Sequence, residues 1–171
     1  MHGDLPSQVI PTNLDVPAGA TCQLNWVEVV GNVTVEGTLT AFSSKFDKNV
    51  NVTGAGSISL INGETSMPIL GNLNITGSSG NSGIYCPNHS NVIQGNINVT
   101  GNSGSFYICT AEVVGGVTIN NNTGSVDISW MNLGKDLSCD GNDPAPRSWS
   151  VEHGYGSTIT AHQKTGQCAG L

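Results

Sequence analysis

Three carboxylates gathered within eight residues, Asp136, Asp140 and Asp143, are the side chains of this sequence best suited to chemistry. Oxygen ligands of this kind, grouped at a turn, suit calcium. Paired carboxylates also cleave glycosides when they stand about 5 to 9 Å apart across a groove. The group lacks the regular spacing of a calcium-binding loop, and we interpret it as polar turn residues. We therefore predict no metal and no cofactor.

The other catalytic residue types do not form a constellation. The four histidines are His2, His89, His153 and His162. No serine or cysteine is placed by the sequence beside a histidine and an acid, as a hydrolase triad requires. The single arginine, Arg147, lies in a proline-rich segment. We expect no enzymatic activity, and a polysaccharide-active lyase or glycoside hydrolase acting through the three aspartates stays open as an alternative.

Uncharged hydrogen-bonding side chains recur at two positions of a repeated phrase. They form the binding residues that we expect: Thr34, Asn51, Thr53, Asn74, Thr76, Asn98, Thr100 and Thr118. On one face of a sheet they would make a flat ladder, which is primarily a solvated face with contacts between neighbouring strands. A carbohydrate or another partner could bind there. The array also resembles, superficially, the Thr-rich faces of ice-binding solenoids, which is a further alternative.

The phrase that positions these residues returns six times. Its copies begin at Gly31, Lys48, Gly71, Gly95, Gly115 and Lys135, and the starts are 17, 23, 24, 20 and 20 residues apart. A period of this length fits one turn of a β-solenoid and is too short for the helical repeats.

Apolar residues occupy the third and fifth positions of each phrase, so alternation with period two places them on the inner face of a strand. These columns are Val33, Val50, Leu73, Ile97, Val117 and Leu137, and Val35, Val52, Ile75, Val99, Ile119 and Cys139. A second apolar column precedes the phrase: Val29, Phe46, Ile69, Ile93, Val113 and Leu133. A third strand follows most phrases, with the pairs Ile58/Leu60, Ile84/Cys86, Phe106/Ile108 and Val126/Ile128. The sequence therefore predicts an all-β fold, a three-sided right-handed parallel β-helix of about six to seven coils.

Two further columns predict the corners. The seventh position reads Gly37, Gly54, Gly77, Gly101, Asn121 and Gly141. Only Gly and Asn readily accept a positive φ, which predicts a left-handed corner. The second position reads Asn32, Asn49, Asn72, Asn96, Gly116 and Asp136. It predicts the same conformation and a ladder of asparagine hydrogen bonds between coils.

We divide the chain, a single domain over 1–171, into an irregular N-terminal cap (1–24), the coils (25–141) and a C-terminal cap (142–171). Prolines near the start and the segment 142–146 interrupt the repeat. Caps are expected because an open solenoid exposes both of its ends.

Five cysteines in a small, lysine-poor chain indicate an oxidising compartment. Cys139 is inward in the last coil and Cys168 lies in the tail, so we predict a disulfide that fastens the C-terminal cap. Cys86 and Cys109 occupy nearly equal places in successive coils and form a second predicted pair. Cys22 remains, as a buried free thiol or as an intermolecular handle.

Charge and hydropathy limit the partners. Only 10% of the residues are charged and the formal net charge is -7, so the chain lacks the basic surface that nucleic acid requires. No apolar run has the length of a membrane span. We therefore expect neither nucleic acid nor a membrane span, and count a homo-oligomer among the partners.

The repeat resembles the right-handed β-helix proteins of the pectin-lyase-like class. More narrowly, it is similar to small secreted Gly/Asn/Val-repeat proteins of Gram-positive bacteria or their viruses. The resemblance covers nearly the whole chain and rests on the Gly-Asn-Val-Thr-Val phrases and on segments 16–22, 136–142 and 164–168. Enzymes of the class use clustered acids with calcium and arginine, or two to three aspartates, and this sequence departs from both patterns.

The expected function is therefore structural: an extracellular or virion-surface β-helix, non-catalytic, that acts as a rigid scaffold or decoration. Two longer segments between coils, 62–68 and 87–92, would be presented as loops to a glycan, a cell or virion surface, or a sister subunit.

Overall fold

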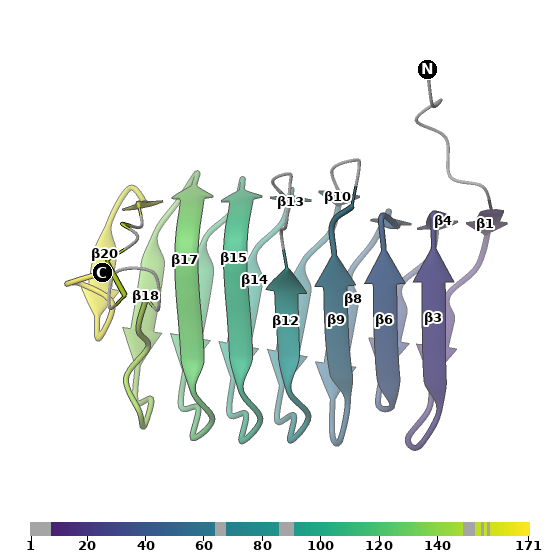
Figure 1. The fold of residues 1–171 in the computed structure, drawn as a ribbon, viewed down its shortest axis with the longest axis horizontal. Helices are drawn as coiled ribbons and strands as arrows, with labels where there is room; N and C mark the ends of the chain where they lie inside the picture. Colours follow the sequence, from purple (N-terminus) through teal and green to yellow (C-terminus); the bar gives the residue numbers. More distant parts are fainter. Residues whose placement is uncertain (1–7, 64–67, 86–90, 149–152, 155, 157) are drawn as a thin grey trace.

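The computed structural model describes residues 8–63, 68–85, 91–148, 153–154, 156 and 158–171. This part of the chain is all-β, and its strands pair in parallel with the equivalent strand one coil away. In Figure 1 the chain ascends along the near side, crosses a short side and descends at the back while advancing toward the C-terminus. This path is a right-handed coil, as the repeat predicts.

Each coil has three sides. We call the near side in Figure 1 the long side, and it consists of β3 (Thr21–Asn25), β6 (Thr38–Phe42), β9 (Ser57–Ile61), β12 (Ser82–Tyr85), and the first halves of β15 (Phe106–Val113) and β17 (Val126–Leu133). The short side consists of β1 (Gln8–Ile10), β4 (Val27–Val29), β7 (Lys45–Phe46), β10 (Pro68–Ile69), β13 (Asn91–Ile93), the second halves of β15 and β17, and β19 (Ile159–Thr160).

The third side carries the repeated phrase, and we call it the phrase side. Its strands are β2 (Leu14–Val16), β5 (Val33–Val35), β8 (Val50–Thr53), β11 (Leu73–Thr76), β14 (Ile97–Thr100), β16 (Val117–Asn120), β18 (Leu137–Asp140) and β20 (Lys164–Gly166). Eight strands at about 4.8 Å give this side a length of about 34 Å.

The core consists of aliphatic stacks that run along the axis. Val33, Val50, Leu73 and Ile97 are successive partners in the phrase-side sheet, and none of them is exposed to solvent. The other predicted inward residues that the structure describes are buried in the same way, including Phe46 and Cys139, while Cys86 lies outside the described residues. Burying each such aliphatic side chain stabilises the fold by about 1.5 to 3 kcal/mol. The predicted stacking of side chains one coil apart is confirmed.

The coils begin earlier than we predicted. We expected an irregular cap over 1–24, but β1, β2 and β3 form a complete turn that pairs with β4, β5 and β6. Leu14 and Val16 extend the columns of Val33 and Val35, while Pro11 and Pro17 fall outside the strands. Proline lacks the N–H that a central strand needs, so its place at corners is compatible with a regular coil.

The C-terminal segment also continues the pairing beyond residue 142. β19 pairs with the end of β17, and β20 pairs with β18. The predicted disulfide joins Cys139 to Cys168 with Cα atoms 5.4 Å apart. The tail therefore adds strands to the last coil and is fastened to it by a covalent bond.

The corner prediction holds for all but one member of the glycine column. Gly54, Gly77, Gly101, Asn121 and Gly141 have φ between 55° and 66°.

Gly37 does not share this left-handed conformation, because the corner between β5 and β6 consists of two residues only, Glu36 and Gly37. Its neighbour Thr38 pairs with Ser57, so Gly37 aligns with Gly56. A Cβ on Gly37 would lie 2.3 Å from the Ala20 carbonyl oxygen, and one on Gly56 would lie 2.4 Å from that of Val35. Gly37 is thus required for close backbone approach between coils.

Candidate functional site

The eight predicted binding residues lie together on the outer surface of the phrase side. Thr34, Asn51, Asn74, Asn98 and Thr118 are successive partners in one column of the sheet. Thr53, Thr76 and Thr100 form the parallel column two residues along each strand. We call these two columns the polar face.

The amides of the polar face bond to one another along the rod. Asn74 donates from Nδ2 to Asn51 Oδ1 at 2.8 Å, and Asn98 donates to Asn74 Oδ1 at 2.7 Å. Beside Asn98, a shallow depression of about 320 Å³ lies between neighbouring coils, with Lys135 and Asp136 at its margin. The asparagines of the polar face thus connect coils, and the column of Thr53, Thr76 and Thr100 carries hydroxyl groups on the outer side of the sheet.

A second asparagine ladder follows the corner before each phrase strand. The side-chain Oδ1 of Asn32 accepts from the backbone N–H of Asn49 (3.3 Å), and Asn49 accepts in turn from Asn72 (2.8 Å). Asn72 and Asn96 continue the series to Gly116. The predicted ladder is confirmed. The predicted left-handed conformation of these asparagines is wrong: their φ angles are negative, and the side-chain Oδ1 reaches the backbone N–H of the next coil from that conformation.

A third ladder, which the sequence analysis missed, is buried at the corner after the phrase strand. Asn102, Asn122 and Asn142 are successive members, and each is at most 5% exposed. The Nδ2 of Asn102 donates to Asn122 Oδ1, and that of Asn122 donates to Asn142 Oδ1, both at 2.8 Å. Gln167 closes the series, because its Oε1 accepts from Asn142 and its Nε2 returns to the Asn142 carbonyl. Their recurrence in the eighth position of the phrase was the available signal.

The three aspartates of the sequence analysis do not converge. Asp136 is exposed, and its Oδ1 lies 3.2 Å from the Nδ1 of His162. Asp140 is four residues further along extended chain, which corresponds to about 13 Å. Asp143 lies beyond the corner and is exposed. Among the described residues no three His, Cys, Asp or Glu side chains meet in a metal-binding group.

The remaining cysteines differ in their surroundings. Cys22 is a free, half-buried thiol in the first coil, and burial raises its pKa. Cys109 is half-buried on β15. Cys86 lies outside the described residues, so its pairing with Cys109 stays a prediction. The segments 62–68 and 87–92 also fall largely outside the described part of the chain.

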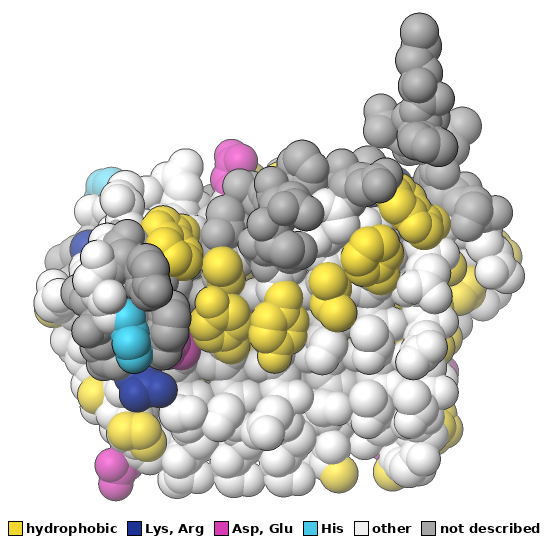
Figure 2. Space-filling view, viewed as in Figure 1, with side chains coloured by type: hydrophobic (Ala, Val, Ile, Leu, Met, Phe, Trp, Pro, Cys, Tyr) yellow, Lys and Arg dark blue, Asp and Glu magenta, His cyan; other side chains and the backbone are white. Residues whose placement is uncertain are grey.

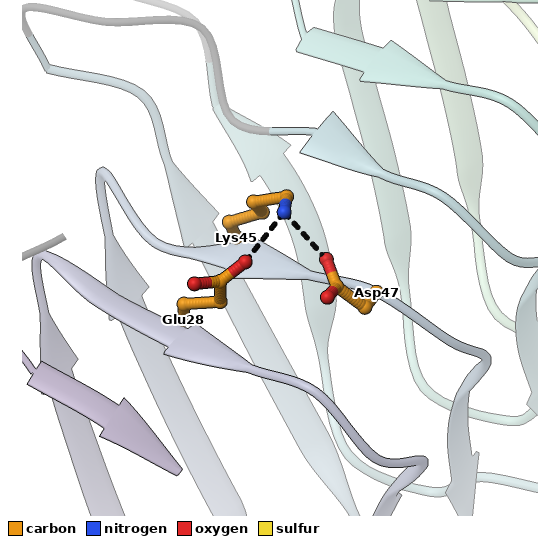
Figure 3. Close-up of polar contacts among 3 residues, drawn as sticks. All are labelled: Glu28, Lys45 and Asp47. Atoms are coloured by element: carbon orange, nitrogen blue, oxygen red, sulfur yellow. Dashed lines mark hydrogen bonds and ion pairs between the residues drawn. The ribbon is translucent and has the colours of Figure 1, made fainter. Parts of the chain in front are cut away.

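A charged cluster on the short side joins two coils (Figure 3). Lys45 Nζ lies 2.5 Å from Glu28 Oε1 and 2.8 Å from Asp47 Oδ1. The hydrogen bond to Asp47 and then that to Glu28 raise the pKa of Lys45. Glu28 and Lys45 are partners in neighbouring strands, so this cluster acts as a surface connection between β4 and β7.

The long side carries a partly exposed apolar stripe that the sequence analysis did not identify; Tyr85 is exposed, and the other members are half-buried. Figure 2 shows hydrophobic side chains in an oblique band across this side. The aromatic band, as we call it, consists of Trp26, Phe42, Ile61, Tyr85 and Tyr107. The rings of Trp26 and Phe42 meet edge to face at 6.2 Å, and those of Tyr85 and Tyr107 lie 5.6 Å apart.

Parallel register, three sides and stacked polar ladders define this protein as a three-sided parallel β-solenoid. No family model matches the chain, and no curated protein or solved structure shows significant similarity to it. The described residues include no helix with the length and hydropathy to cross a bilayer.

Proposed function

We propose that this chain is a non-catalytic extracellular or virion-surface β-helix that serves as a rigid scaffold or adhesive decoration. The observation that carries the proposal is the continuity of the polar ladders from coil to coil. The buried series Asn102, Asn122 and Asn142 ends on Gln167, next to the Cys139–Cys168 bond. A rod in which every coil is bonded to the next has few segments that open locally and admit a protease.

Two observations support an extracellular location. The structure contains a disulfide, and such bonds persist in oxidising compartments. The resemblance of the phrases to secreted repeat proteins of Gram-positive bacteria or their viruses points the same way. The partner in this proposal is a glycan, a cell or virion surface, or a sister subunit.

The absence of catalysis is part of the proposal and has its own test. Asp136 and Asp140 follow one another along a single extended segment, with Cα atoms about 13 Å apart, whereas the paired carboxylates of glycosidases face each other across a groove. We expect no release of reducing sugar or unsaturated product from polyuronides above background. Release that the Asp140→Asn variant abolishes would establish an enzyme instead.

Limited proteolysis of the native chain tests the scaffold. We expect a trypsin- and subtilisin-resistant fragment that spans β1 to β18, and light scattering should define its oligomeric state. Cleavage within β5 to β16 at low protease would contradict a rigid rod. Glycan arrays and binding to whole cells then test adhesion separately from rigidity.

A further inference from the structure

The aromatic band lies on a regular sheet, so its side chains have fixed positions. Phe42, Ile61 and Tyr85 are successive partners in one outward column of the long side. Tyr107 stands in the neighbouring column, opposite Gly83. Trp26 directly follows β3 and has a φ of 57°, and Ser43, which follows β6, has a similar φ of 46°, so this corner conformation recurs from coil to coil.

Tyr85 presents its ring as a platform. A Cβ on Gly83 would lie 2.6 Å from Cε2 and Cζ of Tyr85 and 2.7 Å from its Oη. The tyrosine ring therefore lies over the bare backbone of Gly83, on the same strand. Its side toward the sheet is covered, yet the residue is 42% exposed, so the opposite side of the ring faces solvent. The ring of Tyr107 extends this platform into the next coil.

Neutral hydrogen-bonding groups line the band. Gln23, Thr40 and Ser59 form the outward column beside Phe42 and Ile61. The next column contains Thr38 and Ser57, whose hydroxyls are 3.3 Å apart. Further along, the Oγ of Ser125 donates to that of Ser105 at 2.9 Å.

Charge is scarce on this side of the rod. Of the outward residues on the described long-side strands, Asp127 is the acidic one, and it lies 3.4 Å from the Arg147 guanidinium. This pair adjoins the band at Tyr107, and between Trp26 and Tyr85 a strongly charged partner would find no charged complement on the long-side strands. The surface therefore fits an uncharged ligand.

The long side is small for a stable globular interface on this surface alone. Five residues along a strand and six coils at about 4.8 Å give a sheet of about 17 by 29 Å, or about 490 Å². A standard stable interface buries about 800 Å² on each partner. A thin, extended molecule lying along the band can instead use its whole length.

We propose that the aromatic band binds an extended, uncharged polysaccharide. The apolar C–H faces of its sugar rings stack on Phe42, Tyr85 and Tyr107, while the sugar hydroxyls bond to the column of Gln23, Thr40 and Ser59. The inference deepens the adhesive role proposed above and rests on it. It places the glycan contact on the aromatic band, in place of the loops or the polar face.

Affinity electrophoresis tests this proposal with gels that contain hydroxyethylcellulose, laminarin or galactomannan, and with polygalacturonate as the anionic comparison. We expect at least one neutral polymer to retard the wild-type chain. Tyr85→Ala should weaken the apparent association constant at least tenfold, and Tyr85→Phe should stay within threefold because it keeps the ring. The matched control is Val114→Ala, which removes a 47% exposed apolar side chain outside the band and should not change retardation.

Three electrophoresis results would overturn the inference: no retardation by any neutral polymer, equal retardation of wild type and Tyr85→Ala, or a preference for polygalacturonate. A dimer that Tyr85→Ala dissociates would show a self-association surface and overturn it too. Melting curves verify that each variant folds, and Phe42→Gln provides a second probe two strands away from Tyr85. Protease resistance is measured on the same samples. If no polymer binds but the chain resists protease, the scaffold proposal stands. If the chain is readily cleaved in the absence of polymer, the scaffold proposal itself fails.

Discussion

Asn122 donates a hydrogen bond from Nδ2 to the Oδ1 of Asn142, 2.8 Å away and one coil later, within a buried corner of the rod. The same nitrogen donates to the Val99 carbonyl at 3.0 Å, and the side-chain oxygen accepts from the backbone and side chain of Asn102. Every polar atom of the amide is thus bonded away from water. A buried ladder of this kind contributes stability and also fixes how coils stack.

Truncating this amide should be costly. Asn122→Ala leaves groups of Val99, Asn102 and Asn142 without their partner in a dry corner, and we expect a loss of about 3 kcal/mol in the free energy of unfolding. Denaturant unfolding followed by circular dichroism measures it. The matched control is Asn98→Ala on the polar face, where solvent replaces the lost amide. A loss as large as that of Asn122→Ala would contradict our account.

Reducing the disulfide should loosen the C-terminal end first. The bond closes a loop over a separation of 29 residues, which corresponds to about 3 to 4 kcal/mol in the chain-entropy model. Cys139→Ser with Cys168→Ser should therefore lower the melting temperature and expose the segment after β18 to protease. Cys22→Ser is the control, since Cys22 belongs to no disulfide. An unchanged melting temperature in the double variant would show that strand pairing alone holds the tail.

The left-handed corner predicts a residue-specific tolerance. Gly54 has φ 63°, and no other atom lies within 4 Å of the position that a Cβ would take there, so backbone conformation alone limits substitution. Gly54→Asn should be nearly neutral, because Asn121 adopts the same conformation in its own coil. Gly54→Val should lose about 1 to 2 kcal/mol. Equal unfolding free energies for the two variants would refute the assignment.

Lys45 should contribute stability that is lost at alkaline pH. Its pKa is raised in the folded chain by Asp47 and Glu28, so the contribution is complete below the unfolded pKa of about 10.5 and disappears as pH rises through the folded value. The Lys45 side chain is 35% exposed, and we expect about 1 kcal/mol or less. The unfolding free energies of wild type and Lys45→Met should converge above that range. Lys48→Met, at an exposed neighbour, should show no such convergence.

The fold could be predicted because the residues that determine it recur at regular spacing along the sequence. Apolar residues such as Val33 and Val35 alternate within a strand and repeat after one coil, so both the strand and its partner are evident from spacing. The polar face followed from the same register. The early first coil was missed because its phrase begins with Thr12-Asn13 in place of Gly-Asn and is flanked by Pro11 and Pro17.

The aromatic band could not be predicted from that alignment. Phe42, Ile61 and Tyr85 lie 11, 13 and 14 residues after the starts of their phrases, because the corner before the long side varies in length. Only the register of the long-side strands brings them into one column. The buried asparagines were missed for a different reason: a polar residue after a glycine corner is typical of a solvated turn, and its burial depends on the coils above and below it.

From β14 to β16 and from β16 to β18, partners are one module of 20 residues apart. If such a module were added or removed, each side chain would still stack on a residue of the same kind in the next coil. This includes the buried asparagines, whose amides bond to the next coil. The reach of the molecule can therefore grow or shrink in increments of about 4.8 Å without a new core being invented. A gene that encodes this architecture can change the length of its product by duplicating or deleting a single short segment.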